Sequence, residues 1–227
     1  VSDIKERMLT PPVPGLPWCF DTLTHLTYGR RKGELYGFGA GVGVGKTDVF
    51  TQQISYDIDV LNEKVGVIYL EQNVVETAQR VAGKLDKRLY HIPDAVWTRE
   101  QYEESVDRLD KRNQLYMMEH FGAMDWETVK GIIRYFAKAY DIKMIYLDHL
   151  TALAANEQDE RRALDGIMAD MASLAQSDGL IIHFVSHLTT PEGKAHEEGG
   201  RVLEKHFTGS RAIARWSHYM FGLERDK

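Results

Sequence analysis

The stretch Glu34-Leu-Tyr-Gly-Phe-Gly-Ala-Gly-Val-Gly-Val-Gly-Lys-Thr47 decides the fold of this chain. A short apolar run enters a loop in which every second residue is a glycine, and a Lys-Thr pair then opens a helical pattern. Glycines let consecutive backbone N–H groups turn inward around a polyphosphate, and the N-terminus of the following helix adds positive charge. The stretch therefore predicts a phosphate-binding loop, and with it a protein that binds a nucleoside triphosphate.

Two residues of this loop have individual expected roles. Lys46 would reach the β- and γ-phosphates, and the hydroxyl of Thr47 would ligate Mg²⁺. The usual pattern begins with glycine, whereas this chain has Ala40, which fits if its φ is negative. The whole predicted loop consists of Ala40, Gly41, Val42, Gly43, Val44, Gly45, Lys46 and Thr47.

Composition limits the classes of function. An apolar share of 43% in 227 residues suits one large domain, or a domain with a small arm. The net charge of -6 argues against a generally basic nucleic-acid coat, so contact with DNA or RNA would need a local cluster. The single cysteine, Cys19, excludes an internal disulfide and fits a reducing cytoplasm. No membrane-length apolar run or histidine pair with metal-ligand spacing is present, and no role is predicted for His149 or His183.

From residue 34 onward, apolar runs alternate with helical periodicities. This alternation predicts an α/β domain, a RecA-like core with a mostly parallel sheet and helices on both faces. Residues 34–227 form this predicted core. Predicted strands cover 34–39, 64–71, 114–119, 143–148, 180–187 and 218–224. Predicted helices cover 46–61, 74–85, 125–140, 160–176 and 209–217, and the polar residues 89–112 predict an outer helix after Pro93.

Residues 1–33 predict an N-terminal arm. Its four prolines forbid a regular helix over most of its length, although a short helix over 3–9 is expected. The arm is too apolar for a free linker, so we expect it to pack on the core or on a neighbouring subunit. The residues that support this are Trp18, Phe20, Leu23 and Leu26.

Polar side chains follow several predicted strands where the apolar run stops. Ligands of open α/β sheets bind at the carboxyl ends of strands. Asp148 is expected to hold a hydrated Mg²⁺. Glu71 is expected to orient and deprotonate the water that attacks the γ-phosphate, with Gln72 as the alternative. His187 is a candidate sensor of the γ-phosphate, although a lone histidine is more often structural.

The segment from 189 to 201 is a long, polar, glycine-bearing loop, which is typical of a mobile functional loop or of an unstructured connection. Positive charge concentrates around it in an otherwise acidic chain, at Lys194, Arg201, Arg211 and Arg215. Such a cluster suits the phosphate backbone of a nucleic acid, while a solvated face is the alternative for any single residue.

Together these residues resemble the helicase domain of the ring-forming, DnaB-type replicative helicases, which are RecA-like P-loop ATPases. Within them they are most similar to the primase–helicases of the T-odd phages and the mitochondrial relative Twinkle. The resemblance covers nearly the whole chain, through the phosphate loop and residues 65–78, 145–150, 185–199 and 209–225. The narrowest motif is Gly193-Lys-Ala-His-Glu-Glu-Gly199, which follows a Ser-His-Leu run.

The resemblance implies a catalytic Glu71, a Mg²⁺ ligand at Asp148, a phosphate sensor at His187 and a DNA-binding loop around Lys194. It also implies a homo-hexameric ring with ATP or dTTP at each subunit interface and single-stranded DNA in the central channel. In this ring, residues 1–15 would pack on an adjacent subunit. A primase, polymerase or loader is the expected protein partner, with no membrane contact. The expected location is the cytoplasm of a phage-infected or bacterial cell rather than a mitochondrion.

Three departures from the family pattern stand out. The loop has Thr189 and Thr190 at its first positions and fewer lysines than the family. The basic residue expected after Gly209-Ser210 is displaced, which leaves Ala214. The arginine finger of the family lies on strands beyond Lys227, and no primase part precedes residue 1, so we expect a truncated chain.

Two hypotheses of different classes remain open. The first is a motor that couples ATP hydrolysis to 5′→3′ unwinding of duplex DNA. The second is a RecA-like ATPase that binds DNA or protein partners without unwinding. A small-molecule phosphotransferase lacks an arginine-rich lid here, and a GTPase lacks the Asn-Lys-x-Asp guanine motif.

Overall fold

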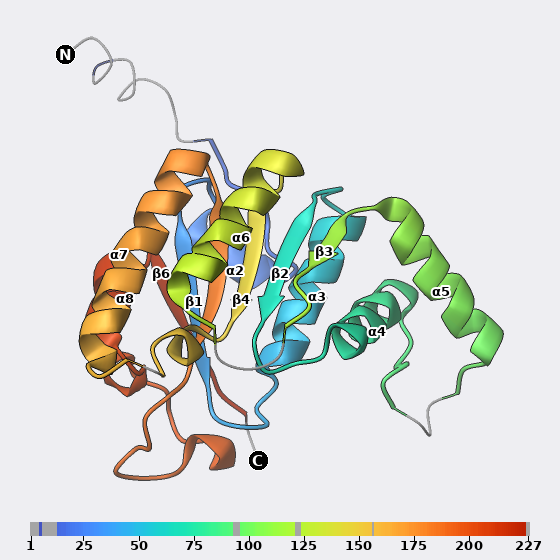
Figure 1. The fold of residues 1–227 in the computed structure, drawn as a ribbon. Helices are drawn as coiled ribbons and strands as arrows, with labels where there is room; N and C mark the ends of the chain where they lie inside the picture. Colours follow the sequence, from blue (N-terminus) through green and yellow to red (C-terminus); the bar gives the residue numbers. More distant parts are fainter. Residues whose placement is uncertain (1–4, 6–12, 93–95, 121–123, 156, 226–227) are drawn as a thin grey trace.

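The computed structural model describes residue 5 and residues 13–92, 96–120, 124–155 and 157–225. Its centre is a six-stranded sheet in the order β3-β2-β4-β5-β1-β6, with every pair of neighbours parallel (Figure 1). The strands are β1 (Leu35–Ala40), β2 (Val65–Tyr69), β3 (Leu115–Met117), β4 (Met144–Asp148), β5 (Ile181–Ser186) and β6 (Tyr219–Leu223). The predicted α/β fold with a parallel sheet is confirmed.

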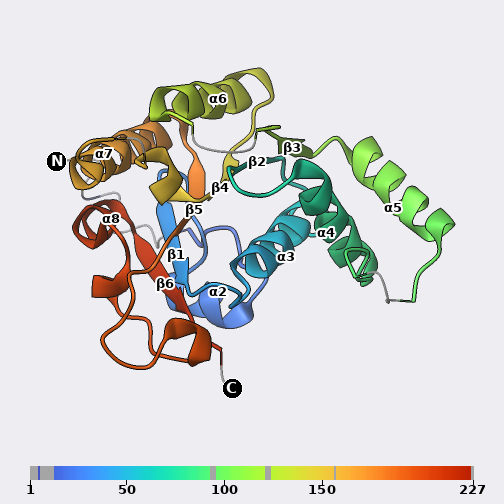
Figure 2. The same cartoon turned by 60° about the horizontal axis from the view of Figure 1, so that its bottom comes forward.

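Helices cover both faces of this sheet. Figure 2 shows α6 and α7 on one face and α2 and α3 on the other. The helices are α2 (Asp21–Thr27), α3 (Lys46–Asp59), α4 (Val74–Asp86), α5 (Arg99–Arg112), α6 (Trp126–Ala139), α7 (Glu160–Asp178) and α8 (Ser210–Trp216), with short 3₁₀ turns η1 (Leu150–Leu153), η2 (His196–Glu198) and η3 (Glu204–His206). In the described ranges, none of these helices has both the length and the apolar composition needed to cross a membrane.

The outer helix predicted after Pro93 begins at Arg99 and ends at Arg112. Thr98 caps it by accepting a hydrogen bond from the N–H of Gln101, whose side chain accepts one from the N–H of Thr98 in return. This capping box satisfies donors that an uncapped helix would leave unpaired. The helix α2 is absent from the sequence prediction, because its short segment has threonine and histidine in place of strong helix formers. The predicted helix over 3–9 lies, apart from residue 5, outside the described residues.

Alternation along the buried strands divides the core into two halves. Ile145 and Leu147 of β4 face the layer of α6 and α7, whereas Met144 and Tyr146 face the layer of α3 and α4. Successive side chains of a strand point to opposite faces, so a strand covered on both sides must be apolar throughout. This double burial is why the strands are evident in the sequence as unbroken apolar runs.

The predicted arm lies partly within the core of its own chain. Trp18 is 2% exposed, and its ring lies 5.1 Å from that of Tyr36 and 5.5 Å from that of Phe221. A backbone bridge joins Leu16 to Arg30. Leu26 is 68% exposed and takes no part in this packing. Contact with a neighbouring subunit stays a prediction.

One charged pair lies inside the sheet–helix interface. The guanidinium of Arg30 donates to both carboxylate oxygens of Asp57, at 2.5 and 2.9 Å, and neither side chain is exposed. The hydroxyl of Tyr146 donates to Asp57 at 2.6 Å, and Nε2 of His183 lies 3.4 Å from Arg30. Burial lowers the pKa of His183, and the positive charge of Arg30 adds to this, so its imidazole is neutral. We call Arg30, Asp57, Tyr146 and His183 the buried polar cluster.

Candidate active site

The predicted phosphate loop connects β1 to α3. β1 ends at Ala40, whose φ is not positive, as the fit of alanine requires. Gly43 and Gly45 have φ of 70° and 113°, in the region that side chains other than glycine rarely adopt. A Cβ on either residue would meet nothing within 4 Å, so conformation rather than crowding requires glycine there. Lys46 and Thr47 then open α3, with Gly45 as the N-cap.

A polar cavity of about 310 Å³ lies beside this loop. β2 and β4 bring its lining residues together because Tyr69 and Asp148 are register partners at the ends of these neighbouring strands. The lining residues are Lys46, Thr47, Tyr69, Glu71, Gln72, Glu76, Arg80 and Asp148. Both predicted Mg²⁺ ligands, the predicted base Glu71 and the alternative Gln72 therefore line the same cavity.

The electrostatics of the cavity floor fit a hydrated divalent cation. Burial raises the pKa of Asp148, and the nearby positive charge of Lys46 opposes this. The hydroxyl of Tyr69 is buried without a hydrogen-bond partner among the described residues, and burial raises its pKa as well. A partly buried carboxylate that lines a polar cavity next to the Thr47 hydroxyl offers oxygen ligands, which suits Mg²⁺.

Glu71 meets two imidazoles at the edge of this cavity. Its Oε1 lies 2.9 Å from Nε2 of His149, and its Oε2 lies 4.0 Å from Nε2 of His187. Burial acts to raise the pKa of Glu71, but the contact with His149 and the charge of Lys46 outweigh burial, and the pKa lies below its ordinary value. The carboxylate is therefore ionised at neutral pH and able to accept a proton.

His187 lies directly after β5, between Glu71 and the loop that follows. Burial lowers the pKa of His187 to about 4, and the neighbouring His149 and Lys46 contribute to the shift. The imidazole is thus neutral at neutral pH, with one nitrogen able to donate and the other to accept. A second cavity, of about 100 Å³, lies between the phosphate loop and this following loop, and His187 and Lys46 both line it.

The phosphate loop also touches the polar loop directly. The backbone N–H of Val42 donates to Oε1 of Glu197 at 2.9 Å. A Cβ on Gly41 would lie 2.8 Å from the same oxygen, so this glycine admits the carboxylate. Glu197 belongs to η2, within the Gly193–Gly199 motif. The side chain of Glu197 therefore connects the polar loop to the phosphate loop by a hydrogen bond.

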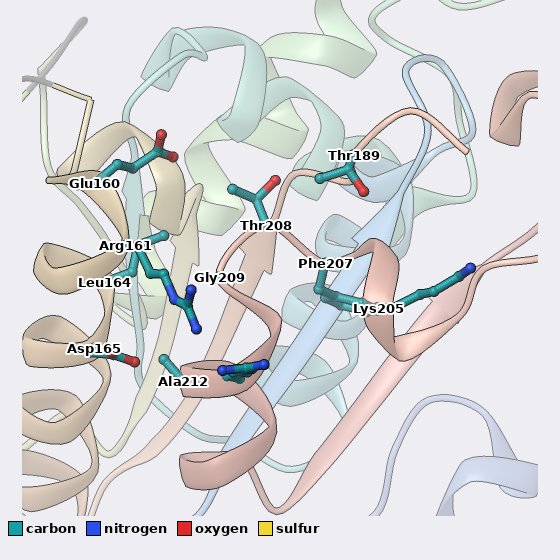
Figure 3. Close-up of a pocket in the computed structure, with 11 residues that line it drawn as sticks. Glu160, Arg161, Leu164, Asp165, Thr189, Lys205, Phe207, Thr208, Gly209 and Ala212 are labelled. Carbon is teal, nitrogen blue, oxygen red and sulfur yellow. The ribbon is translucent and has the colours of Figure 1, made fainter. Parts of the chain in front are cut away.

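The four candidate nucleic-acid residues, Lys194, Arg201, Arg211 and Arg215, are all exposed, but they do not line one common cavity. Arg211 lines a cavity of about 470 Å³ together with Arg161 and Lys205 (Figure 3). In Figure 3, Arg161 points from α7 toward the turn at Gly209. Glu160 and Asp165 also line this cavity, so its wall carries three cations and two anions.

Sequence reasoning missed several residues at these cavities. Tyr69 and Arg80 line the nucleotide-sized cavity, His149 contacts Glu71, and Arg161 and Lys205 join Arg211. Only His149 had a local signal, because it directly follows the strand-end aspartate. The others reach their positions through packing between elements that lie far apart in the sequence.

The family model for the DnaB-like helicase C-terminal domain matches residues 15–194. A curated relative, the DNA helicase/primase of Enterobacteria phage T3, is 30% identical over 234 residues. This match covers 99% of the present chain and 41% of the relative, so the chain spans about two fifths of that protein.

Two solved structures share the fold. A DnaB-like replicative helicase, described with its interactions with primase, aligns with a TM-score of 0.79 at 16% identity, over 99% of this chain and 56% of its own. The ATPase domain of a second protein aligns with a TM-score of 0.76 at 15% identity, over 99% of this chain and 81% of its own. At these identities the likeness concerns the fold alone.

Proposed function

This chain belongs to the DnaB-like helicase C-terminal domain family, and on that basis we propose that it is the ATP-hydrolysing motor of a replicative DNA helicase. It translocates on single-stranded DNA and unwinds duplex DNA, with the 5′→3′ direction that the resemblance implies. It acts as a homo-hexameric ring, and ATP or dTTP binds with Mg²⁺ at the subunit interfaces. The observation that carries the proposal is the convergence of Lys46, Glu71 and Asp148 on one polar cavity at the strand ends.

Nucleotide binding rests on the loop and on two strand-end groups. The backbone N–H groups of the phosphate loop surround the polyphosphate, and Lys46 neutralises charge on the β- and γ-phosphates. Thr47 and Asp148 would hold Mg²⁺, which shields the phosphate oxygens when it is bound. The raised pKa of the partly buried Asp148 carboxyl, caused by burial, supports this assignment, because a bound cation would compensate its charge.

Hydrolysis rests on Glu71 as the group that orients the attacking water and takes its proton. Its lowered pKa keeps it ionised, and its side chain is 65% exposed toward the cavity, so a water can reach it. Gln72 lines the same cavity and stays the alternative for orienting the water. An amide is not basic, so Gln72 could position the water without accepting its proton.

Coupling to DNA rests on the two contacts between the nucleotide site and the polar loop. His187 lies beside Glu71, where it would respond to the presence of the γ-phosphate. Glu197 bonds to the phosphate loop itself through Val42. A bound phosphate would disturb both contacts, and either change would shift the segment that carries Lys194.

The nucleic-acid surface includes the cavity around Arg211. Arg161 and Lys205 add positive charge to Arg211, and Thr189 and Thr208 line the same space. Phosphate oxygens favour cations with hydroxyl or amide donors beside them. Lys194, Arg201 and Arg215 would extend this surface, which compensates for the few lysines in the loop.

The test is ATP hydrolysis with and without single-stranded DNA, followed by strand separation on duplexes with either a 5′ or a 3′ tail. We expect the strand to stimulate turnover and only the 5′-tailed duplex to be unwound. Arg161→Ala combined with Arg211→Ala should lower the affinity for the strand and its salt dependence. Unwinding that requires a 3′ tail would reverse the direction.

A regulatory ATPase without unwinding is the second candidate, favoured by the acidic groups Glu160 and Asp165 in the Arg211 cavity, which weaken its attraction for phosphates. Turnover that ignores single-stranded DNA, together with no strand separation from either tail, would support this candidate and contradict the motor.

A further inference from the structure

His149 is the buried neighbour of the exposed Glu71. It follows Asp148 directly and is 5% exposed, and it caps the 3₁₀ turn η1. Its Nδ1 accepts a hydrogen bond from the backbone N–H of Ala152 at 3.2 Å, and it also lies 2.6 Å from the hydroxyl of Thr151. The ring is thus fixed on its Nδ1 side by the turn that it caps.

These contacts set the tautomer of the ring. A backbone N–H can only donate, so the Nδ1 that faces Ala152 carries no hydrogen. In the neutral imidazole the hydrogen must then be on Nε2. Nε2 lies 2.9 Å from Oε1 of Glu71, so the donor side of the ring faces the carboxylate.

The two partners differ in freedom. His149 is buried and held by its cap, whereas the side chain of Glu71 is 65% exposed. The contact is short but does not meet ideal hydrogen-bond angles, since Nε2 has no aligned acceptor among the described residues. A small rotation of the freer Glu71 side chain would align it. A fixed donor therefore orients a mobile acceptor.

The ring of His149 also stacks on the ring of His187. Their centroids are 3.8 Å apart and their planes differ by 28°. Nε2 of His187 lies 4.0 Å from the other carboxylate oxygen of Glu71. The position of His149 thus affects both of the groups that are proposed to act at the γ-phosphate.

We propose that His149 is the positioning residue of the hydrolysis site, and this rests on the proposed role of Glu71. Its Nε2–H holds Oε1 of Glu71 and leaves Oε2 free for the attacking water. Its face supports His187 in reach of the same carboxylate. The chemistry is performed by Glu71, and His149 acts only through it.

The same three side chains invite a different interpretation. Glu71, His149 and His187 each offer a ligand atom within 4.8 Å of the others, a set that suits a transition-metal ion. Metal ligation by Nε2 of His149 would require the hydrogen to move to Nδ1. Nδ1–H would then face the N–H of Ala152, and two donors would meet without an acceptor. The hydrogen bond from Ala152 therefore disfavours metal binding through Nε2 of His149.

Two substitutions separate positioning from capping. In His149→Gln the side-chain amide reaches the place of Nε2 and still donates to Glu71, but the cap is lost. In His149→Asn the shorter side chain places Oδ1 near Nδ1, which keeps the cap to Ala152 and loses the donor to Glu71. Asparagine is a favourable capping residue, so this variant should fold.

The measurement is kcat and KM for ATP in the presence of single-stranded DNA. We expect His149→Asn to lower kcat by about 100-fold with little change in KM, because a misplaced catalytic group slows the chemical step. His149→Gln should restore most of kcat. The reverse order, with Gln impaired and Asn active, would show a capping role and overturn the proposal.

A double variant shows whether His149 acts through Glu71. If it does, adding His149→Asn to Glu71→Gln should slow hydrolysis no further than Glu71→Gln alone. A further fall of about 100-fold, the effect that a misplaced group has by itself, would overturn the positioning role. Full activity of Glu71→Gln alone would instead overturn the proposed base, and this inference with it.

Discussion

The buried polar cluster and the candidate active site use the same two strands for opposite purposes. β4 supplies Tyr146 to the buried cluster and Asp148 to the site. β5 contains His183, and His187 follows directly after it. In the buried cluster the side chains of Arg30 and Asp57 are fully enclosed and bonded to each other, whereas at the site the side chain of Glu71 is 65% exposed.

The difference shows what each set of charges can do. Charges enclosed with their partners are fixed, so they hold the arm, α3 and the sheet in one arrangement, and they cannot reach a ligand. Glu71 at the strand ends keeps an exposed carboxylate, whereas neither side chain of the Arg30–Asp57 pair is exposed. A ligand can reach the carboxylate there. We therefore expect substitutions in the buried cluster to reduce stability and substitutions at the site to reduce turnover.

The largest effect on stability should come from Arg30→Met. It leaves the carboxylate of Asp57 buried without its charge partner, which typically costs about 3–5 kcal/mol of unfolding free energy. Urea unfolding followed by circular dichroism measures this change. The control is Arg112→Met. Arg112 pairs with Asp59 at 2.6 Å, but both side chains are partly exposed. Exposed pairs contribute only about 0–1 kcal/mol. Equal losses in the two variants would contradict the comparison.

Lys46→Ala should reduce turnover strongly and leave the unfolding free energy nearly unchanged. Removing one charge that stabilises the transferring phosphate costs on the order of 10²–10³-fold in turnover, while the unfolding free energy should change little. Lys84→Ala is a suitable control. Lys84 pairs with Asp48, which lies in the same helix as Lys46, but Lys84 itself does not line the cavity. An ATPase assay and an unfolding curve on each variant make the test. Retained turnover in Lys46→Ala would exclude the assigned nucleotide site.

Glu197→Ala should have a smaller and more selective effect. It removes the bond from the N–H of Val42 but no group that lines the 310 Å³ cavity. We expect basal ATP hydrolysis to change less than its stimulation by single-stranded DNA, because Lys46, Glu71 and Asp148 all remain in place. The stimulation by single-stranded DNA should fall. Glu198→Ala is the adjacent control, and equal stimulation in both variants would remove Glu197 from the coupling route.

Much of the fold and of the nucleotide site could be predicted from the sequence because the signals are local. The phosphate loop, its helix and the aspartate at the end of an apolar run lie within short stretches whose spacing already fixes their geometry. The strands were evident because burial on both faces makes them continuously apolar. The ends of elements were less predictable, as the late start of α5 at Arg99 shows.

The remaining features depend on contacts between distant segments. Nothing near Arg30 indicates that it is buried, because its partner Asp57 lies in the helix after the phosphate loop. Arg161 of α7 and Lys205 of η3 meet at one cavity only through the packing of α7 against α8. His149 lay next to a predicted ligand, but its contact with Glu71 requires the pairing of β2 with β4.

One pair of equivalent substitutions tests most directly whether the buried polar cluster serves stability and the candidate active site serves turnover. Asp57→Asn and Glu71→Gln each replace a carboxylate by its amide, one in the buried cluster and one at the site. For each variant, the unfolding free energy and kcat for ATP hydrolysis are measured on the same preparation. We predict that Asp57→Asn loses about 3–5 kcal/mol of stability because the buried charge of Arg30 is left without its counter-charge. Glu71→Gln should keep its stability and nucleotide binding and hydrolyse ATP about 10²–10⁴-fold more slowly, as expected for loss of a general base. Undiminished hydrolysis in Glu71→Gln, or a loss of stability equal to that of Asp57→Asn, would contradict the account.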